Sequence, residues 1–568
     1  MQITNQIHLR NLRGDIFGGV TAAVIALPMA LAFGVASGAG AASGLWGAVL
    51  VGFFAALFGG TPALISEPTG PMTVVMTAVI AHFIAAYPEN EGYGMAVAFT
   101  VVMMAGVFQI IFGSLKLGKY VTMMPYTVIS GFMSGIGIIL VILQLAPFLG
   151  QASPKGGVIG TLQAVPELLS NVQPAETLLA LMTVGLIWFM PSKFKKVIPP
   201  QLVALIAGTV LSLVAFDGVD IRRIGEISAG FPTLNIPTFS GAELSLMFVD
   251  AAMLGMLGCI DALLTSVVAD SLTRTEHNSN KELIGQGLGN IMSGLFGGIA
   301  GAGATMGTVV NIQAGGRTAL SGLTRSAVLL VVILGASGLA ATIPLAVLAG
   351  IALKVGVDII DWDFLKRAHK ISWKGSLIMY GVILLTVLVD LIAAVGIGVF
   401  IANVLTIDRM SSLQSESVKA ISDADDTVLL NDSEKRWLDQ GNGRVLLFQL
   451  SGPMIFGVAK AINREHNAIS NCDAVVFDLS DVPHMGVTSS LALENAVKEA
   501  VEKGRHVFIV GAAGQTKRRL EDMDVLSLLP PHHLHTDRAE ALRCAVATVA
   551  DPQEASQPVD LGNAAIAS

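Results

Sequence analysis

The chain has 568 residues, of which 53% are hydrophobic and only 13% are charged. An average soluble chain carries about 25% charged residues, so this composition excludes a purely soluble protein. A net charge of −8 without a basic tail excludes nucleic acid as a partner, and three cysteines are too few for a disulfide framework or a thiolate zinc cluster.

Charged residues are unevenly distributed along the chain. Of the 76 charged residues, 36 follow Arg409, so their frequency rises from about one in ten to nearly one in four. This shift predicts a transmembrane domain over 1–409, a polar linker with an entry helix over 410–440, a soluble domain over 441–550 and a disordered tail over 551–568.

Apolar runs in the first part are long enough to cross a bilayer as helices. They lie near 16–36, 46–60, 95–114, 127–148, 176–190, 198–215, 251–269, 325–349 and 376–405, and the last is predicted to hold two spans divided near Asp390. Shorter or glycine-interrupted segments near 70–86, 284–300 and 303–314 raise the count, and we predict 14 transmembrane helices.

Basic residues predict the orientation of these spans. With 14 spans that start inside, the inner loops receive most of the Lys and Arg residues, Arg325 included, whereas the outer loops hold only Lys155, Arg222 and Arg223. We therefore expect a multi-pass protein of the plasma membrane with both termini in the cytoplasm.

Two short segments in the two halves of this domain resemble each other. Residues 66–75 read SEPTGPMTVV and residues 302–311 read AGATMGTVVN, and each follows a glycine-rich approach. Paired short, glycine- or proline-interrupted segments are typical of the substrate site of transporters built from inverted repeats.

Asp261 interrupts the apolar run MLGMLGCIDALLTSVV. A carboxylate in the middle of a bilayer is costly and normally marks an ion or proton path. Thr265 lies one helical turn further on the same face, and a carboxylate with a hydroxyl and freed backbone carbonyls suits Na⁺.

Helix starts near Pro71 and Thr305 would offer unpaired N–H groups and a partial positive charge to a small anion. Neither 66–75 nor 301–311 contains a basic residue. This charge balance favours a monovalent anion beside Na⁺ over a divalent one.

Other polar features are interpreted as structural. Glu67 is expected in a solvated loop, and the histidines of PHHLH (531–535) are expected at the surface. G-x-S-x-G, HExxH and P-loop motifs are absent from the sequence, so we predict that the protein is not an enzyme and has no cofactor besides a coupling ion.

The soluble part alternates strands and helices. Strands are predicted at 444–450, 474–480 and 506–511, with helices at 456–469 and 490–504 between them, which indicates a small α/β domain.

Two stretches carry a family resemblance. ALPMALAFGVASGAGAASGLWGA (26–48) resembles the first-helix signature of SulP-type anion transporters, and VVFDLSDVPHMGVTSSLALENA (475–496) resembles the core motif of a STAS domain. Three further segments are most similar to the sodium-dependent bicarbonate transporters of this family. They read TPALISEPTGPMTVV, GCIDALLTSVVADSLTRTEHNSNKE and GGIAGAGATMGTVVNIQ.

The resemblance implies a 14-helix fold of two inverted seven-helix repeats, divided into core and gate domains, followed by a cytoplasmic α/β STAS domain that joins a homodimer. It implies a Na⁺ site made by Asp261, Thr265, the Gly303 carbonyl and Thr305. It also implies that bicarbonate binds at the helix starts, in contact with Thr69, Gly70, Pro71, Met72, Ala304 and Thr305.

We therefore expect Na⁺:HCO₃⁻ symport by elevator-like alternating access. Two alternatives stay open: a proton-coupled transporter of another small monovalent or sulfate-like anion, and a membrane scaffold whose STAS domain recruits a partner.

Overall fold

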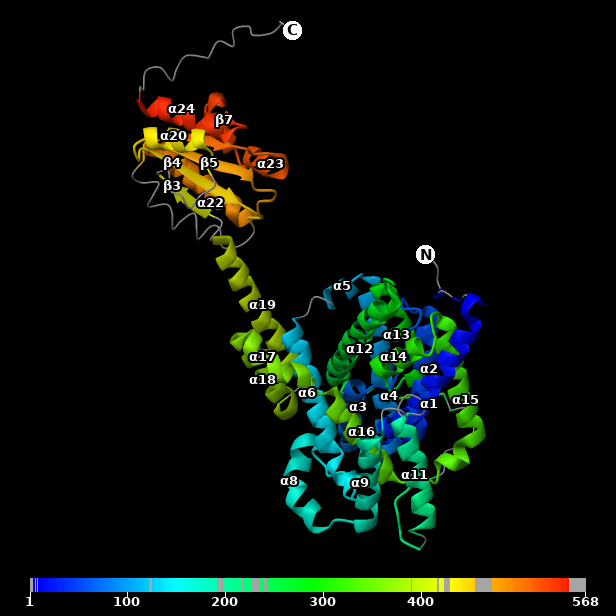
Figure 1. Cartoon of the computed structure of the whole chain (residues 1–568). Helices are drawn as coiled ribbons and strands as arrows, with labels where there is room; N and C mark the ends of the chain where they lie inside the picture. Colours follow the sequence, from blue (N-terminus) through cyan, green and yellow to red (C-terminus); the bar gives the residue numbers. More distant parts are fainter. Residues whose placement is uncertain are drawn as a thin grey trace. The chain divides into compact units, whose positions relative to one another are not determined.

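The computed structural model divides into two compact units, Met1–Ala402 and Asn403–Ser568 (Figure 1). The structure describes residues 4–550 except 6, 8, 122–124, 192–193, 195–198, 217, 226–231, 233, 240, 242, 390, 416–417, 423–429 and 455–471. The predicted helix at 456–469 and the predicted tail at 551–568 therefore lie outside the described residues.

The first unit is almost entirely helical. Its elements are η1 (Leu9–Asn11), α1 (Leu12–Ala36), α2 (Ala41–Phe58), β1 (Ser66–Glu67), α3 (Gly70–Ala86), α4 (Glu91–Ser114), α5 (Gly118–Val121), α6 (Tyr126–Leu143), α7 (Leu145–Phe148), α8 (Gly157–Ser170), α9 (Pro174–Phe189), α11 (Pro200–Val214), α12 (Leu244–Thr273), α13 (Ser279–Leu295), β2 (Ala302–Gly303), α14 (Thr305–Gln313), α15 (Ala319–Ala340), α16 (Leu345–Ile359), α17 (Trp362–Ile371), α18 (Trp373–Leu388) and α19 (Leu391–Ser415).

Among the described residues, five helical segments are long and apolar enough to cross a membrane, or six if the bent pair α8 and α9 forms one span. The five are Leu9–Ala36, α2, α4, α6 and α12. Other apolar helices, including α3, α11 and α18, are shorter. The predicted total of 14 spans stays a prediction.

One predicted span is wrong. The apolar run 325–349 is divided between α15 and α16 by a break at 341–344. Pro344 is the N-cap of α16, and a proline disfavours helical geometry in the residue before it, so the first helix ends and a second begins.

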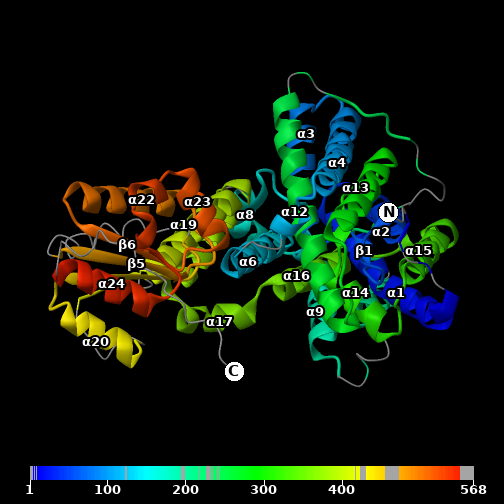
Figure 2. The same cartoon turned by 90° about the horizontal axis from the view of Figure 1, so that it is seen from above.

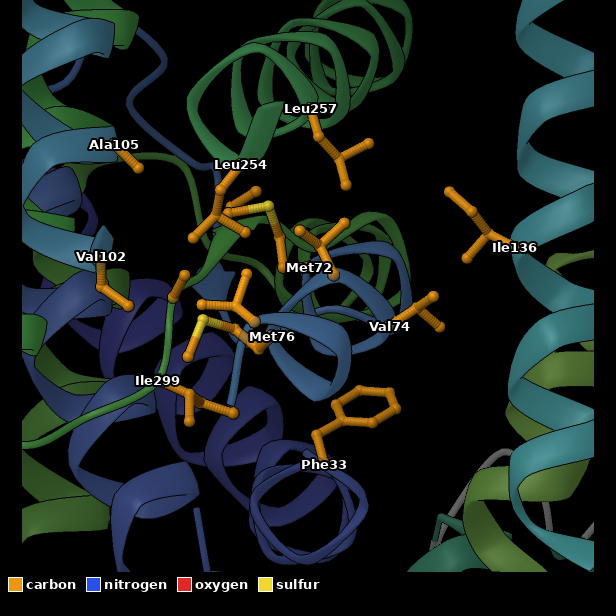
Figure 3. Packing of buried hydrophobic residues seen from close by; sticks show 14 of the residues in the cluster. Phe33, Met72, Val74, Met76, Val102, Ala105, Ile136, Leu254, Leu257 and Ile299 are labelled. Carbon is orange, nitrogen blue, oxygen red and sulfur yellow. The ribbon is translucent and has the colours of Figure 1, made fainter. Parts of the chain in front are cut away.

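The core of this unit surrounds α3. Figure 3 shows Met72, Val74 and Met76 of this helix among apolar side chains of several other segments. Phe33 comes from α1, Leu254 from α12, and Ile136 from α6. This packing holds the start of α3 deep inside the unit, where Met72 is fully buried.

In its described residues, the second unit is a five-stranded sheet with helices on both faces. Its order is β3-β4-β5-β6-β7, in which β3 is antiparallel to β4 and the other pairs are parallel. Its elements are β3 (Val418–Ile421), α20 (Asp432–Gln440), β4 (Val445–Ser451), β5 (Ala474–Asp481), α22 (Val487–Glu502), β6 (His506–Val510), α23 (Gly514–Asp522), η2 (Leu526–Leu528), η3 (Pro531–His533), β7 (Leu534–His535) and α24 (Arg538–Ala550).

Successive residues of a strand point to opposite faces, so alternating apolar residues build two cores. Leu446, Phe448 and Leu450 of β4 lie in one core with residues of α22, whereas Val445 and Leu447 lie in the other with residues of α24. Figure 2 shows α22 and α24 on opposite faces of the sheet. The three predicted strands and the predicted helix at 490–504 are confirmed. The segment 410–440, predicted as a linker plus an entry helix, contains the helix α20 and in addition the strand β3, which was not predicted.

Candidate functional site

The two similar sequence segments pair with each other in the structure. Strands β1 and β2 are antiparallel, with Ser66 opposite Gly303 and Glu67 opposite Ala302. The pairing is extended by a hydrogen bond of 2.8 Å from the Ala304 backbone N–H to the Ile65 carbonyl oxygen. Each strand leads within three residues into a helix, α3 or α14, so the two helix starts lie at one place in the fold.

These helix starts differ in how their first turns are satisfied. Thr69 is the N-cap of α3, and its side chain accepts a bond of 3.5 Å from the Met72 backbone N–H. Ala304, the N-cap of α14, makes no side-chain capping bond. The first turn of α14 therefore keeps N–H groups that an anion can accept from.

Helix α12 places one oxygen-bearing side chain beside each of the two helix starts. Asp261 is only 7% exposed, and its Oδ2 atom accepts a hydrogen bond of 2.7 Å from the Thr69 hydroxyl. One turn further, the fully buried Thr265 hydroxyl donates to the Gly303 carbonyl oxygen at 2.9 Å and lies 2.9 Å from the Thr305 hydroxyl oxygen. The carboxylate thus reaches the start of α3, and the hydroxyl reaches the start of α14.

The close approach of α12 to β2 depends on a glycine. A Cβ atom at Gly303 would lie 3.0 Å from the Cα atom of Ala262 and 3.1 Å from the Cβ atom of Thr265. A side chain at this position would therefore have to displace its neighbours, and the glycine lets the Gly303 carbonyl come within reach of Thr265 without that displacement.

The structure brings together three of the four residues predicted to bind Na⁺, Thr265, Gly303 and Thr305, and the fourth, Asp261, lies one helical turn before Thr265 in α12. They supply a carboxylate, two hydroxyl oxygens and one carbonyl oxygen, which is the donor chemistry that hard cations prefer. Within the described residues, Asp261 has no basic side chain at ion-pair distance. A buried carboxylate without such a partner can bind a cation or take up a proton.

The six residues predicted to bind the anion surround the same place. Thr69, Gly70, Pro71, Met72 and Ala304 are buried, whereas Thr305 is exposed. The Met72 side chain lies in the apolar core (Figure 3), so at this residue only the backbone can face an anion.

Sequence reasoning missed a buried ion pair behind this site. Glu67 is 2% exposed and is bound by the Arg325 guanidinium, which is itself fully buried in α15. The expectations of a solvated loop for Glu67 and of an inner loop for Arg325 are both wrong. An isolated arginine in an apolar helix is a signal for such a site, but it does not identify its partner.

Three polar residues of α13, spaced four apart, were also missed. The Glu282 carboxylate accepts bonds of 2.8 Å from the backbone N–H groups of Gly60 and Thr61, and the Gln286 amide donates to the Ser66 hydroxyl at 2.6 Å. The Asn290 side chain bonds both the N–H and the carbonyl of Gly301. This polar stripe, readable as i, i+4, i+8, holds the segments that lead into both strands.

In the second unit, the histidines of PHHLH were expected at the surface, and for His533 this is wrong. His533 is 5% exposed, and its Nδ1 atom lies 2.8 Å from the Val507 carbonyl oxygen. Burial lowers the pKa of His533 from 6.5 to about 4. The ring is a neutral part of the core, stacked on Phe508.

Comparison with known proteins gives a consistent result. Residues 12–382 match the sulfate permease family and residues 436–541 match the STAS domain. The chain is 77% identical over 558 residues to the bicarbonate transporter BicA of Synechocystis sp., covering 98% of each chain. It is 78% identical to BicA of Picosynechococcus sp., over 96% of this chain and 97% of the relative.

Among solved structures, the transmembrane domain of a cyanobacterial bicarbonate transporter BicA is 80% identical, with a TM-score of 0.65, and covers 69% of this chain and 100% of that structure. The family match, the identity to transporters over nearly the full length and the helical fold agree with one another. The chain belongs to the sulfate permease family of membrane transporters and carries a C-terminal STAS domain.

Proposed function

We propose that this protein takes up bicarbonate together with Na⁺ across the plasma membrane. The observation that carries the proposal is the convergence of Asp261, Thr265, the Gly303 carbonyl and Thr305 beside two helix starts. The high identity to relatives named bicarbonate transporters supports the choice of anion.

In this proposal Na⁺ binds to the Asp261 carboxylate, the Thr265 and Thr305 hydroxyls and the Gly303 carbonyl. The ion offsets the carboxylate charge, which otherwise repels an anion at the neighbouring helix starts. Bicarbonate then binds between the backbone of Thr69–Met72 and that of Ala304–Thr305. Each ion raises the affinity for the other by the same factor, as thermodynamic linkage requires.

The Thr69 hydroxyl connects the two ions. It donates to Asp261 and also accepts from the first turn of α3, so a change at the carboxylate is felt at the anion side. With one Na⁺ per bicarbonate the transported charge is zero, and the sodium gradient alone drives uptake.

We further propose that transport follows elevator-like alternating access, that both termini are cytoplasmic, and that the STAS domain joins a homodimer. The asymmetric distribution of Lys and Arg supports the orientation. Cross-linking of single cysteines in the STAS domain, in a background without native cysteines, tests the dimer.

Uptake of labelled bicarbonate into proteoliposomes, with an inward gradient of Na⁺ or of K⁺ at one fixed pH, tests the function. We expect uptake with Na⁺ only. Equal uptake with both cations would contradict coupling to Na⁺, and a steep rise of uptake when the assay is repeated at lower pH would then make Asp261 a proton carrier. No uptake with either cation would contradict the proposed substrate.

A further inference from the structure

A buried pair of opposite charges lies beside the proposed anion site, and the symport described above does not use it. The Arg325 guanidinium donates through Nη1 to the carbonyl oxygens of Ala48 at 2.8 Å and Ser66 at 2.9 Å, and through Nη2 to the Glu67 carboxylate. Both side chains are at least 97% buried. The pair thus joins α15 to α2 and to strand β1.

The guanidinium has little freedom to move. A Cβ atom at Gly52 of α2 would lie 2.4 Å from Arg325 Nη1, so this glycine makes the room that the guanidinium occupies. Figure 2 shows β1 close to α2 and α14. The position of the positive charge is therefore set by backbone groups of α2 and β1.

The Glu67 carboxylate lies against the first turn of α14. A Cβ atom at Gly307, the third residue of that helix, would be only 3.3 Å from Glu67 Oε1. The Thr308 hydroxyl accepts a bond of 3.0 Å from the Ile65 backbone N–H, which holds β1 and α14 together at this place. Along the chain, Glu67 precedes Thr69 by two residues.

One negative and one positive charge therefore stand behind the helix starts proposed to hold the anion. A carboxylate at the first turn of α14 competes with a bound anion for the partial positive charge of that helix end. The guanidinium offsets this effect, so that the pair adds no net charge. In a low-dielectric interior, one uncompensated unit charge would strongly change the binding energy of a neighbouring ion.

We propose that the Glu67–Arg325 pair sets the charge of the anion that the site accepts. The neutral pair selects a monovalent anion, an excess of positive charge admits a divalent oxyanion, and an excess of negative charge weakens the binding of any anion. Both residues are specificity-determining and act through the helix starts rather than by touching the substrate. This inference rests on the proposed function and names the feature that determines its selectivity.

Four proteins test the inference: the unmodified chain, Glu67→Gln, Arg325→Met, and the double variant. Each is reconstituted in proteoliposomes, and uptake of labelled bicarbonate and of labelled inorganic sulfate is measured under the same Na⁺ gradient. We expect the sulfate-to-bicarbonate ratio to rise about tenfold or more in Glu67→Gln, because a unit charge acts twice as strongly on a divalent ion. In Arg325→Met the KM for bicarbonate rises about tenfold.

The double variant is the matched control, because it removes both charges and restores neutrality. Replacing a buried ion pair by neutral groups is far less disruptive than leaving one partner alone. We expect the ratio of the double variant to lie within about threefold of the unmodified chain. A merely structural role would lower uptake of both anions together in every variant and leave the ratio unchanged.

If Glu67→Gln does not give a monodisperse protein, Arg325→Met and the double variant still decide the question. A KM for bicarbonate that is raised in the single variant and recovers in the double variant supports the inference. An equal sulfate-to-bicarbonate ratio and an equal KM in all variants would overturn it. Failure of the unmodified chain to take up bicarbonate with Na⁺ would instead overturn the proposed function.

Discussion

Asp478 of the second unit and Asp261 of the first unit are both buried carboxylates, but their hydrogen-bond partners differ. In the second unit, Asp478 is 1% exposed and accepts bonds of 3.0 Å from the Ser480 backbone N–H and from Arg538. Arg538 also makes two bonds, of 2.8 and 3.0 Å, to Glu434. Asp261 of the first unit is bonded by the Thr69 hydroxyl and, within the described residues, has no such cation.

This difference distinguishes a structural carboxylate from one suited to a mobile cation. At Asp478 the Arg538 guanidinium is a permanent cation that offsets the negative charge of the carboxylate. Asp261 is bonded by a neutral hydroxyl instead, which in our proposal leaves the carboxylate free to bind a mobile cation. Burial alone does not identify an ion site, since the buried Glu282 accepts its bonds from the Gly60 and Thr61 backbone N–H groups and the Gln286 amide, whereas we propose that Na⁺ binds Asp261.

The largest expected effect comes from removing the negative charge of Asp261. Asp261→Asn keeps the shape and the hydrogen bond to Thr69 but removes the charge that attracts Na⁺. We expect the Na⁺-dependent part of bicarbonate uptake to fall about a hundredfold while the protein stays folded, since a charge-assisted ligand to the ion is lost. Asp270→Asn, near the end of the same helix, is the control and is expected to keep uptake above half. Unchanged Na⁺ dependence in Asp261→Asn would contradict the assigned ion site.

Removing Arg538, the cation shared by Glu434 and Asp478, is expected to lower the stability of the second unit instead. Arg538→Met leaves Glu434 and Asp478 without their cation, and we expect the second unit to lose about 2–4 kcal/mol of stability. Amide hydrogen exchange of β4–β6 in the full chain measures this loss. The KM for Na⁺ in bicarbonate uptake should stay unchanged. A shifted KM for Na⁺ would show that Arg538 affects ion binding as well as the stability of the second unit.

A smaller effect is expected from crowding the contact between α12 and β2. Gly303→Ala adds a Cβ atom 3.0 Å from the Cα atom of Ala262, which displaces the carbonyl from Thr265 at a cost of about 1–3 kcal/mol. We expect the KM for Na⁺ to rise about tenfold. Gly185→Ala in α9, where a Cβ atom meets no neighbour within 4 Å, is the matched control. A KM for Na⁺ that is equal in both variants would place the carbonyl outside the ion site.

The smallest expected effect concerns pH and the second unit. The pKa of His533 is lowered to about 4 in the folded state, whereas an unfolded histidine titrates near 6.5. The unfolded chain therefore binds more protons between these values, and stability is lost as the pH falls through this window. From pH 7.5 to 5.5 we expect a loss of about 1 kcal/mol from this residue.

Hydrogen exchange of β6 and β7 at the two pH values, corrected for intrinsic rates, measures the change. His533→Phe should abolish this part of the pH dependence, while the exposed His484→Gln should keep it. An identical pH dependence in all three proteins would show that another group is responsible.

How much was predictable from the sequence depended on the distance between partners along the chain. Asp261 and Thr265 are one turn apart on one helix, so periodicity alone placed them on one face. The similar segments at 66–75 and 302–311 pointed to a common site because they resemble each other in sequence and each follows a glycine-rich approach. The predicted strands of the second unit were found for the same reason, since each is a continuous buried apolar run.

Features that depend on distant partners were not predictable in this way. Arg325 and Glu67 are 258 residues apart, and a charged residue in isolation is assigned to solvent by any local rule. The conclusion that no basic residue lies near the anion segments was therefore true of the sequence but not of the space around them. Strand β3 was assigned to a linker because four residues paired only with β4 carry little periodicity of their own.

The bonds from Arg325 to strand β1 have a consequence for how the protein is made. The Ser66 carbonyl receives its bond from Arg325, 259 residues later in the chain. During synthesis from the N-terminus, Glu67 is made well before Arg325 and stays without its guanidinium throughout that interval. The Glu67–Arg325 pair therefore forms only after α15 has been synthesised, and the surroundings of Glu67 reach their final arrangement at that late step.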